Sequence, residues 1–164
     1  MPQYDQNKNR GAYSSGSYGS GSTPSGPPTY GNENKKVSFS ADWITSGITD
    51  DAIIFAEGFG EHLKGANFTT SQIRNVFGEI KRIQMAGFNN GRTDFLLLKP
   101  KMAYAARRAQ DKDRSTGATD FERVMKLAHE AVKARTEHDE VRFKNFCDFI
   151  EAILAYHKAA GGRD

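Results

Sequence analysis

Positively charged side chains recur at helical spacing in two neighbouring parts of the sequence. Arg74 and Lys81 stand seven residues apart, and so do Lys101 and Arg108, with Tyr104 between them. Seven residues of an α-helix return to nearly the same side of the helix and span roughly 10.5 Å along its axis. Two such stripes on neighbouring antiparallel helices could form one ridge that binds the phosphates of a polyanion. A solvated face whose aliphatic stems cover the edge of the core is the competing interpretation.

The charge is distributed unevenly along the chain, although its sum is small. The 164 residues carry a formal net charge of +3. The segment Asp42–Glu61 holds five acids and no lysine or arginine, whereas the stretch 74–108 holds eight basic residues and two acids. An acidic block beside a basic block polarises a domain and steers its association with charged partners. The eight basic residues are Arg74, Lys81, Arg82, Arg92, Lys99, Lys101, Arg107 and Arg108.

Motifs for catalysis are weak in this sequence. The glycines of EGFGEH lack the lysine and serine that end a Walker-type phosphate loop, and no nucleophile-elbow pattern is present. His138 and Asp139 form a His-Asp pair of the kind found in helical metal-dependent phosphohydrolases. Further ligands could come from His62, His129 and Asp148. Asp139 lies in an expected turn, however, where capping the next helix is the simpler role. We therefore expect no enzyme activity, no metal and no other cofactor.

Helix-start and helix-stop signals recur in the middle of the chain. Thr49 is expected to cap a helix over 50–64. Thr69 and Gln72 form a capping box, which opens a helix that should end near Gly87. The first basic stripe would lie on this second helix, along one edge of its apolar face.

Three more helical regions follow. The region 95–110 carries the second basic stripe and contains Pro100, which should kink the helix or start a new one. A second capping box at Thr119 is expected to open a helix that ends near residue 135, and the last helix should run over 139–160. No alternation typical of strands occurs. The expected fold is therefore all-α, a compact bundle of about five helices.

The last helix contains the single cysteine of the chain. Cys147 falls on an apolar stripe, so we expect a buried thiol. One cysteine excludes an intrachain disulfide framework and fits a reducing compartment. His157, near the end of this helix, could be partly cationic and stabilise the helix dipole. The N-terminus has no apolar signal segment and no apolar run approaches the ~18 residues needed to span a bilayer, so we expect a soluble, cytoplasmic protein without membrane contact.

Residues 1–36 differ from the rest of the chain in composition. They are rich in glycine, serine, proline and tyrosine, and they contain no leucine, isoleucine, valine or phenylalanine. Such a segment cannot bury enough apolar surface to offset its chain entropy. We expect a flexible, disordered low-complexity tail over 1–36 and a helical domain over 37–164. The spaced tyrosines of the tail could alternatively stack on RNA bases.

Three segments, in the same order and with similar spacing, resemble one known family. TTSQIRNVFGEIKRI, FLLLKPKMAYAARR and FKNFCDFIEAILAYHK are similar to the small helical subunit of type III-A CRISPR effector complexes, the Csm complexes. The similarity runs from about Trp43 to Lys158. The resemblance implies a non-catalytic subunit in antiviral defence, with CRISPR RNA, target RNA, neighbouring copies of itself and the backbone and large subunits as partners. It also implies that target cleavage belongs to an aspartate of the backbone subunit.

The resemblance further implies which surface contacts RNA. A basic ridge would follow the guide–target duplex and contact mainly the backbone of the target RNA. The rival interpretations are a helical protein–protein adaptor whose basic patch meets an acidic partner, and a metal-dependent phosphohydrolase. By position the ridge would use Arg74, Lys99, Lys101 and Arg108, to which helical spacing adds Lys81 and, as secondary candidates, Arg82 and Arg107.

Overall fold

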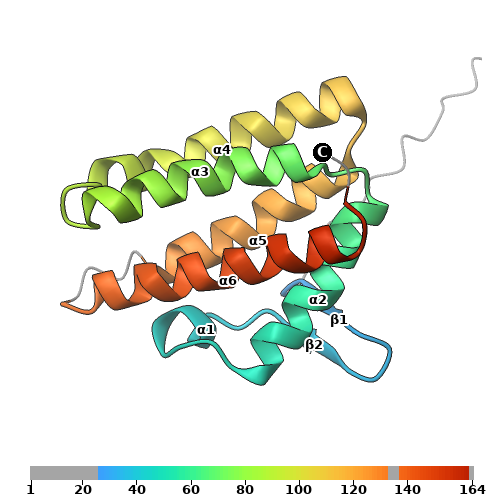
Figure 1. The fold of residues 1–164 in the computed structure, drawn as a ribbon, viewed down its shortest axis with the longest axis horizontal. Helices are drawn as coiled ribbons and strands as arrows, with labels where there is room; N and C mark the ends of the chain where they lie inside the picture. Colours follow the sequence, from blue (N-terminus) through green and yellow to red (C-terminus); the bar gives the residue numbers. More distant parts are fainter. Residues whose placement is uncertain (1–25, 133–136, 163–164) are drawn as a thin grey trace, which may run out of the picture.

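The computed structural model of the chain describes residues 26–132 and 137–162. Within them, six helices and two short strands are stacked in three tiers (Figure 1). The pair α3 and α4 forms the upper tier, α5 and α6 lie beneath it, and α1 and the strands form the lowest tier, from which α2 rises obliquely toward the start of α3. The elements are β1 (Thr29–Gly31), β2 (Lys36–Ser38), α1 (Asp42–Thr45), α2 (Asp50–Gly65), α3 (Thr70–Ala86), α4 (Arg92–Asp113), α5 (Thr116–Val132) and α6 (Asp139–Ala159). The predicted all-α class is confirmed.

Helix α2 lies at the centre of an aromatic core. Thr49 caps it as predicted, because its side chain accepts a hydrogen bond from the backbone N–H of Ala52 at 3.3 Å. The ring of Phe55 is fully buried. It packs against Trp43 of α1 and Phe149 of α6, with ring centroids 5.3 and 6.0 Å apart. Such aromatic pairs supply much of the buried apolar area in a small domain.

Two glycines of α2 let neighbouring backbones come close to it. A Cβ atom at Gly58 would overlap the backbone of Gly31 in β1. A Cβ atom at Gly60 would lie 2.6 Å from the backbone nitrogen of His157 in α6. Both α2 glycines are buried. The glycines of EGFGEH therefore allow close packing on two sides of α2.

Part of the expected tail is folded. Strand β1 pairs with β2 in antiparallel register, with Tyr30 opposite Val37. The ring of Tyr30 lies 4.7 Å from that of Phe59, and burial raises the pKa of its hydroxyl to about 12. The boundary predicted at residue 36 thus falls inside a hairpin, which composition could not reveal because its first strand contains no leucine, isoleucine, valine or phenylalanine. Residues 1–25, which carry the rest of the expected tail, lie outside the described residues.

Helices α3 and α4 follow the sequence expectations closely. The capping box is present: Thr69 accepts from the N–H of Gln72 at 3.2 Å, and the side chain of Gln72 accepts from the N–H of Thr69 at 2.8 Å. Helix α3 ends at Gly87, whose φ of 81° favours glycine. Helix α4 continues through Pro100 as a single helix. Of the two alternatives for this proline, the start of a new helix is wrong.

Helix α5 begins one turn earlier than predicted. The expected cap, Thr119, lies inside the helix, which starts at Thr116. The Ser115 hydroxyl and the Gly117 N–H both donate to the carbonyl of Ala66, each at 3.2 Å. These bonds fasten the start of α5 to the connection between α2 and α3. Because this contact joins distant parts of the chain, local capping signals could not reveal it.

Helix α6 begins at Asp139, but this residue is not its N-cap. His138 occupies the N-cap position. Asp139 is buried and pairs with Arg92, at the start of α4, at 3.3 Å. The expected capping role of Asp139 is therefore replaced by a contact between helices. Cys147 is buried as predicted, and burial raises the pKa of its thiol to about 12.

His157 also has a different role from the expected one. It is fully buried, and its Nε2 donates to the carbonyl of Phe68 at 2.7 Å, while its Nδ1 lies 3.4 Å from the hydroxyl of Thr70. Burial lowers the pKa of His157, and the contact with the Phe68 carbonyl offsets this only in part. The expectation of a partly cationic imidazole is therefore wrong. A neutral ring ties the end of α6 to the start of α3.

We expect Gly58→Ala to destabilise the protein, although alanine is the better helix former. The added methyl group would collide with the backbone of Gly31, so the hairpin would have to move away from α2. Overpacking of this kind costs about 1–3 kcal/mol. Thermal or urea unfolding of the purified variant measures the change.

Gly78→Ala in α3 is the matched control. Nothing lies within 4 Å of the position that its Cβ would take. This substitution should therefore stabilise the protein by roughly 0.5–1 kcal/mol through helix propensity alone. Equal effects of the two substitutions would show that the close approach of β1 to α2 does not constrain the fold.

Candidate nucleic-acid interface

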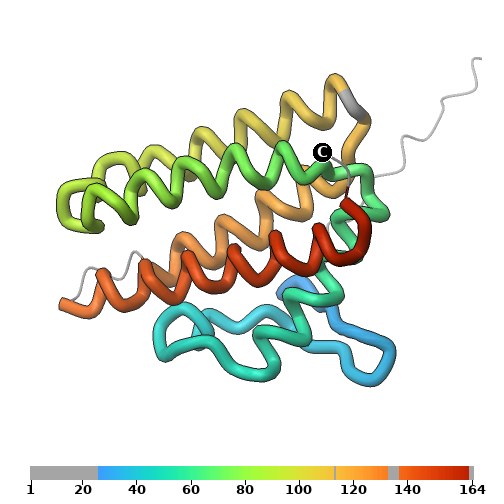
Figure 2. The backbone as a smooth tube through the Cα atoms, viewed as in Figure 1, coloured from blue at the N-terminus to red at the C-terminus, as the bar shows by residue number. Residues whose placement is uncertain are grey.

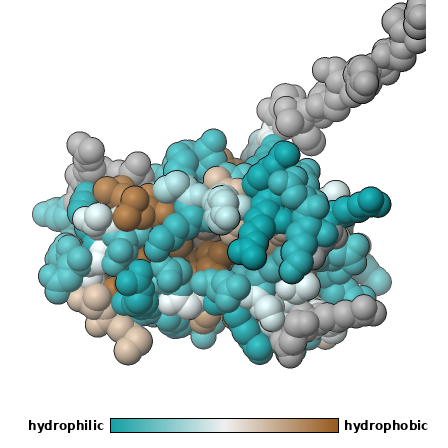
Figure 3. Space-filling view, turned by 90° about the horizontal axis from the view of Figure 1, so that it is seen from above, coloured by the Kyte–Doolittle hydropathy of each residue, from teal (hydrophilic) through white to brown (hydrophobic). Residues whose placement is uncertain are grey.

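All seven predicted basic residues lie on the pair α3 and α4. The two helices run antiparallel and side by side (Figure 2). Ion pairs cross between them: the Lys101 Nζ lies 2.7 Å from a carboxylate oxygen of Glu79, and a guanidinium nitrogen of Arg82 lies 3.7 Å from one of Asp94. Figure 3 looks onto this side of the molecule, where hydrophilic surface predominates and separate apolar areas show between the polar side chains.

The two predicted basic stripes, one on α3 and one on α4, lie next to different parts of the molecule. Lys81 lies 3.3 Å from Glu151 of α6. Arg74, seven residues earlier on α3, shares the side of Lys81 by helical spacing. Lys101 instead pairs across α3 and α4 with Glu79. The antiparallel arrangement required for one ridge is present, but the stripe of Arg74 and Lys81 borders α6, whereas the stripe of Lys101 borders the space between α3 and α4.

Glu79 holds two of the predicted cations. Hydrogen bonds from Lys101 and then from Arg82 lower the pKa of Glu79 below its ordinary value. The Arg82 bond, at 2.9 Å, joins residues three apart on α3. The side chains of Lys101, Glu79 and Arg82 are 49%, 39% and 56% exposed, so solvent reaches all three. Glu79, Lys101 and Arg82 together therefore carry a net charge of +1, whereas the two basic residues alone would carry +2.

Two further cations are also paired. Lys99 donates to Glu130 of α5 at 2.8 Å, and this bond lowers the pKa of Glu130. Arg107 pairs with Asp111, one turn further along α4, at 3.2 Å. Lys99 therefore points toward α5, on a different side of α4 from Lys101. Exposed pairs of this kind contribute only about 0–1 kcal/mol each.

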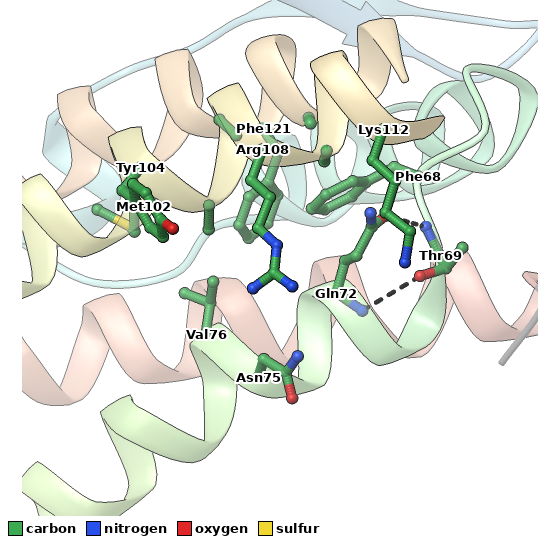
Figure 4. Close-up of a pocket in the computed structure, with 14 residues that line it drawn as sticks. Phe68, Thr69, Gln72, Asn75, Val76, Met102, Tyr104, Arg108, Lys112 and Phe121 are labelled. Atoms are coloured by element: carbon green, nitrogen blue, oxygen red, sulfur yellow. Dashed lines mark hydrogen bonds between the residues drawn. The ribbon is translucent and has the colours of Figure 1, made fainter. Parts of the chain in front are cut away.

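Arg108 and Lys112 differ from these residues. Both are exposed on α4, one turn apart, and no acidic side chain pairs with either one among the residues that the structure describes. They line a cleft of about 400 Å³ between α3 and α4. Figure 4 shows the Arg108 side chain reaching from α4 toward α3, between Tyr104 and Lys112. Asn75 lies on the α3 side of this cleft.

The cleft has an apolar floor. Phe68, just before α3, and Phe121 of α5 meet there with ring centroids 5.0 Å apart. Val76 of α3 and Met102 of α4 line it beside them. A cleft that combines an apolar floor, unpaired cations and amide groups can bind a ligand that is both flat and negatively charged.

The sequence revealed only part of this site. Arg108 was predicted from it, whereas Lys112 was not, because α4 was expected to end at 110. Lys112 continues the row of Tyr104 and Arg108 at four-residue spacing, a pattern that could have identified it. The floor could not have been found, because Phe68 and Phe121 meet only in the folded structure.

The described residues contain neither a cluster able to hold a metal nor a helix able to cross a bilayer. No three of their histidine, cysteine, aspartate and glutamate side chains gather at one point. No helix among them is long and apolar enough to span a membrane. The candidate ligands have separate contacts: His62 with Asp120, His129 with the carbonyl of Phe95, His138 with Glu137, Asp139 with Arg92, and Asp148 with Lys144.

One model of a known protein family matches the chain. The model, described as Csm2 Type III-A, matches residues 49–163. No curated protein and no solved structure matches the chain. The matched region begins at the N-cap of α2 and includes α3, α4 and the cleft between them.

We expect the pKa of Glu79 to rise in Lys101→Met, because the largest cause of its lowering is the hydrogen bond from Lys101. Titration of the side-chain carboxylates by carbon-detected NMR measures this pKa directly. Lys99→Met is the control, since it should raise the pKa of Glu130 and leave that of Glu79 unchanged. An unchanged pKa of Glu79 in Lys101→Met would mean that Lys101 is not held by Glu79 in solution.

Proposed function

Because the chain belongs to the Csm2 family, the small subunit of type III-A CRISPR complexes, we propose that it acts there as a non-catalytic subunit that contacts the target RNA backbone. The family places the chain in antiviral defence and in association with the other Csm subunits. The observation that supports an RNA contact is the exposed pair of Arg108 and Lys112, which no acidic side chain neutralises among the described residues. RNA offers a phosphate charge at every nucleotide to such cations.

Contacts with phosphate suit the role of such a subunit. They fix the position of a strand without reading its sequence. In an RNA-guided complex, pairing between guide and target reads the sequence, so the proteins along the duplex need only hold its backbone. We place this subunit along the guide–target duplex, with CRISPR RNA and target RNA as its nucleic-acid partners.

The proposed ridge keeps all seven basic residues, with different weights. Arg108 should contribute most to RNA binding, and we add Lys112 to the ridge beside it. Lys81, Arg82, Lys99, Lys101 and Arg107 each have an acidic partner, so a phosphate must displace a carboxylate to bind them. These surface pairs are weak, which makes the exchange feasible. Arg74 adds a further exposed cation on α3.

Exposed apolar side chains provide a separate surface for protein partners. Met85 at the end of α3 is 88% exposed, Leu97 near the start of α4 is 48% exposed, and Val141 near the start of α6 is 58% exposed. These helix ends lie together at one end of the molecule (Figure 1), whereas the cleft lies near the start of α3 and the second half of α4. Apolar residues left in solvent near one another are typical of protein interfaces. We propose that neighbouring copies or the backbone and large subunits cover this end.

Arg108→Gln combined with Lys112→Gln should weaken target-RNA binding by the reconstituted complex by about tenfold, the order of magnitude of a lost hydrogen bond to a charged group. The loss should be similar for every target that matches the guide, because phosphate contacts carry no base information. The slope of log affinity against log salt should become shallower by roughly 0.7 for each phosphate contact that is lost. Binding titrations at several salt concentrations measure both quantities.

The double variant Lys99→Gln with Arg107→Gln is the matched control. It removes the same amount of charge from the same helix, but from residues that are already paired. Its effect should be several times smaller. Equal losses in the two double variants would show that overall charge, and not the unpaired position of Arg108 and Lys112, governs RNA binding.

The purified chain should not hydrolyse RNA in the presence of Mg²⁺, Mn²⁺ or Zn²⁺. His138 and Asp139 engage neighbouring side chains, and the other candidate ligands lie apart from them. Incubation with end-labelled RNA, followed by gel electrophoresis, tests this expectation. Cleavage that persists through purification and disappears in His138→Ala with Asp139→Ala would favour the phosphohydrolase interpretation instead.

A further inference from the structure

We infer that the cleft between α3 and α4 binds one unpaired RNA nucleotide, with its base over the apolar floor and its phosphates on Arg108 and Lys112. This inference rests on the proposed function, because it assumes that this side of the domain meets RNA. It goes further, because binding to the RNA backbone requires exposed cations but no cleft. A base, by contrast, needs an apolar surface and a space to enter.

One row of α4 side chains has the composition of a site for single-stranded nucleic acid. Tyr104, Arg108 and Lys112 follow one another at four-residue spacing and span roughly 12 Å along the helix. Tyr104 is 71% exposed, which leaves a large aromatic ring in solvent beside two cations. Proteins that bind single strands combine basic side chains, which follow the backbone, with aromatic rings on which bases stack.

The interior of the cleft has the size and lining of a ligand site. Its volume of about 400 Å³ falls within the usual range of roughly 300–1,000 Å³ for small-molecule pockets. Phe68, Val76, Met102 and Phe121 line it, each less than 10% exposed. A flat ring entering between α3 and α4 would therefore lie against these side chains.

The polar groups of the cleft match the edge of a base. Figure 4 places Asn75 at the α3 side, across from Arg108. Its amide supplies both a donor and an acceptor, which can pair with the hydrogen-bonding edge of a base. Gln72 is already engaged, because it forms the capping box with Thr69. Asn75 is therefore the side chain we assign to the base edge.

The charge of the cleft favours a nucleotide over a purely apolar ligand. Its lining includes the cations of Arg108 and Lys112 and no acidic side chain. The carboxylates of an acidic peptide would also meet these cations, but they would offer no flat ring to the apolar floor. A nucleotide matches both, since every base has a flat π-face and every linkage a phosphate. A base held in this cleft cannot be paired at the same time, so the site would take a nucleotide outside the duplex.

Comparison of two single-stranded oligomers tests the inference. One is a labelled oligouridylate, and the other is an abasic oligomer of the same length, which carries the same phosphates without bases. Fluorescence anisotropy with the full chain should show about tenfold weaker binding of the abasic oligomer, within the range for one stacked base. Tyr104→Ala should reduce this difference, whereas Tyr104→Phe, which keeps the ring, should preserve it.

Ala105→Phe provides an independent test of the cleft itself. Ala105 is exposed and lines the cleft, so a larger ring there should occupy the space without altering any charge. This variant should lose affinity for oligouridylate and keep its affinity for the abasic oligomer. Melting curves establish that each variant remains folded.

Any other outcome contradicts the inference, and each one leads to a different conclusion. Equal affinity of the two oligomers, with both bindings weakened by salt, removes the base site but leaves the proposed contact with the RNA backbone intact. If the chain binds neither oligomer, the base site is wrong and the proposed RNA contact also loses its support. If, in addition, Ala105→Phe prevents assembly with the other Csm subunits, the cleft is a protein-docking surface.

Discussion

The structure depends on how closely α2 can approach its neighbours. Gly58 admits the β1 backbone and Gly60 admits that of α6, so the rings of Phe55 and Phe59 become buried without intervening space. Side chains at either glycine would separate the tiers that meet at α2. Once α6 is held against α2, the buried His157 at the end of α6 can bond to the carbonyl of Phe68 and fix the start of α3. The position of the α3 and α4 pair therefore follows from packing at α2.

The cleft lies at the end of α3 that is most firmly anchored. Three contacts meet there: the capping box of Thr69, the His157 bond to Phe68, and the bonds from the start of α5 to Ala66. A site built on fixed backbone loses little conformational entropy when a ligand binds, which favours affinity. Arg108 and Lys112 of α4 line the cleft beside this end of α3, so the fold holds the two unpaired cations next to the apolar floor.

The distribution of ion pairs, more than the number of basic residues, determines where a polyanion can bind. Acidic side chains of α3, α4, α5 and α6 meet most of the cations of the basic block. Within this block, Arg108 is left without a carboxylate partner among the described residues, and Lys112 beside it in the cleft is a second such cation. In the proposed role each copy would need only such a limited contact, because neighbouring copies and the other subunits would share the RNA backbone with it.

Local signals in the sequence were sufficient for most of the longer helices and for the family, whereas the short helix α1, the start of α5 and the site were not predicted from them. Capping boxes, glycine stops and apolar stripes act within a few residues of the chain, so the caps at Thr49 and Thr69 and the end at Gly87 were predictable. The three segments that resemble the Csm small subunit could be recognised from the sequence for the same reason. The β1–β2 hairpin, the earlier start of α5 and the neutral His157 could not, because each depends on a partner far away in the sequence. The basic residues show both cases. Spacing along one helix already brings Arg82 to Glu79 and Arg107 to Asp111, but only the tertiary structure decided that Lys81, Lys99 and Lys101 meet carboxylates of other helices and that Arg108 faces an open cleft.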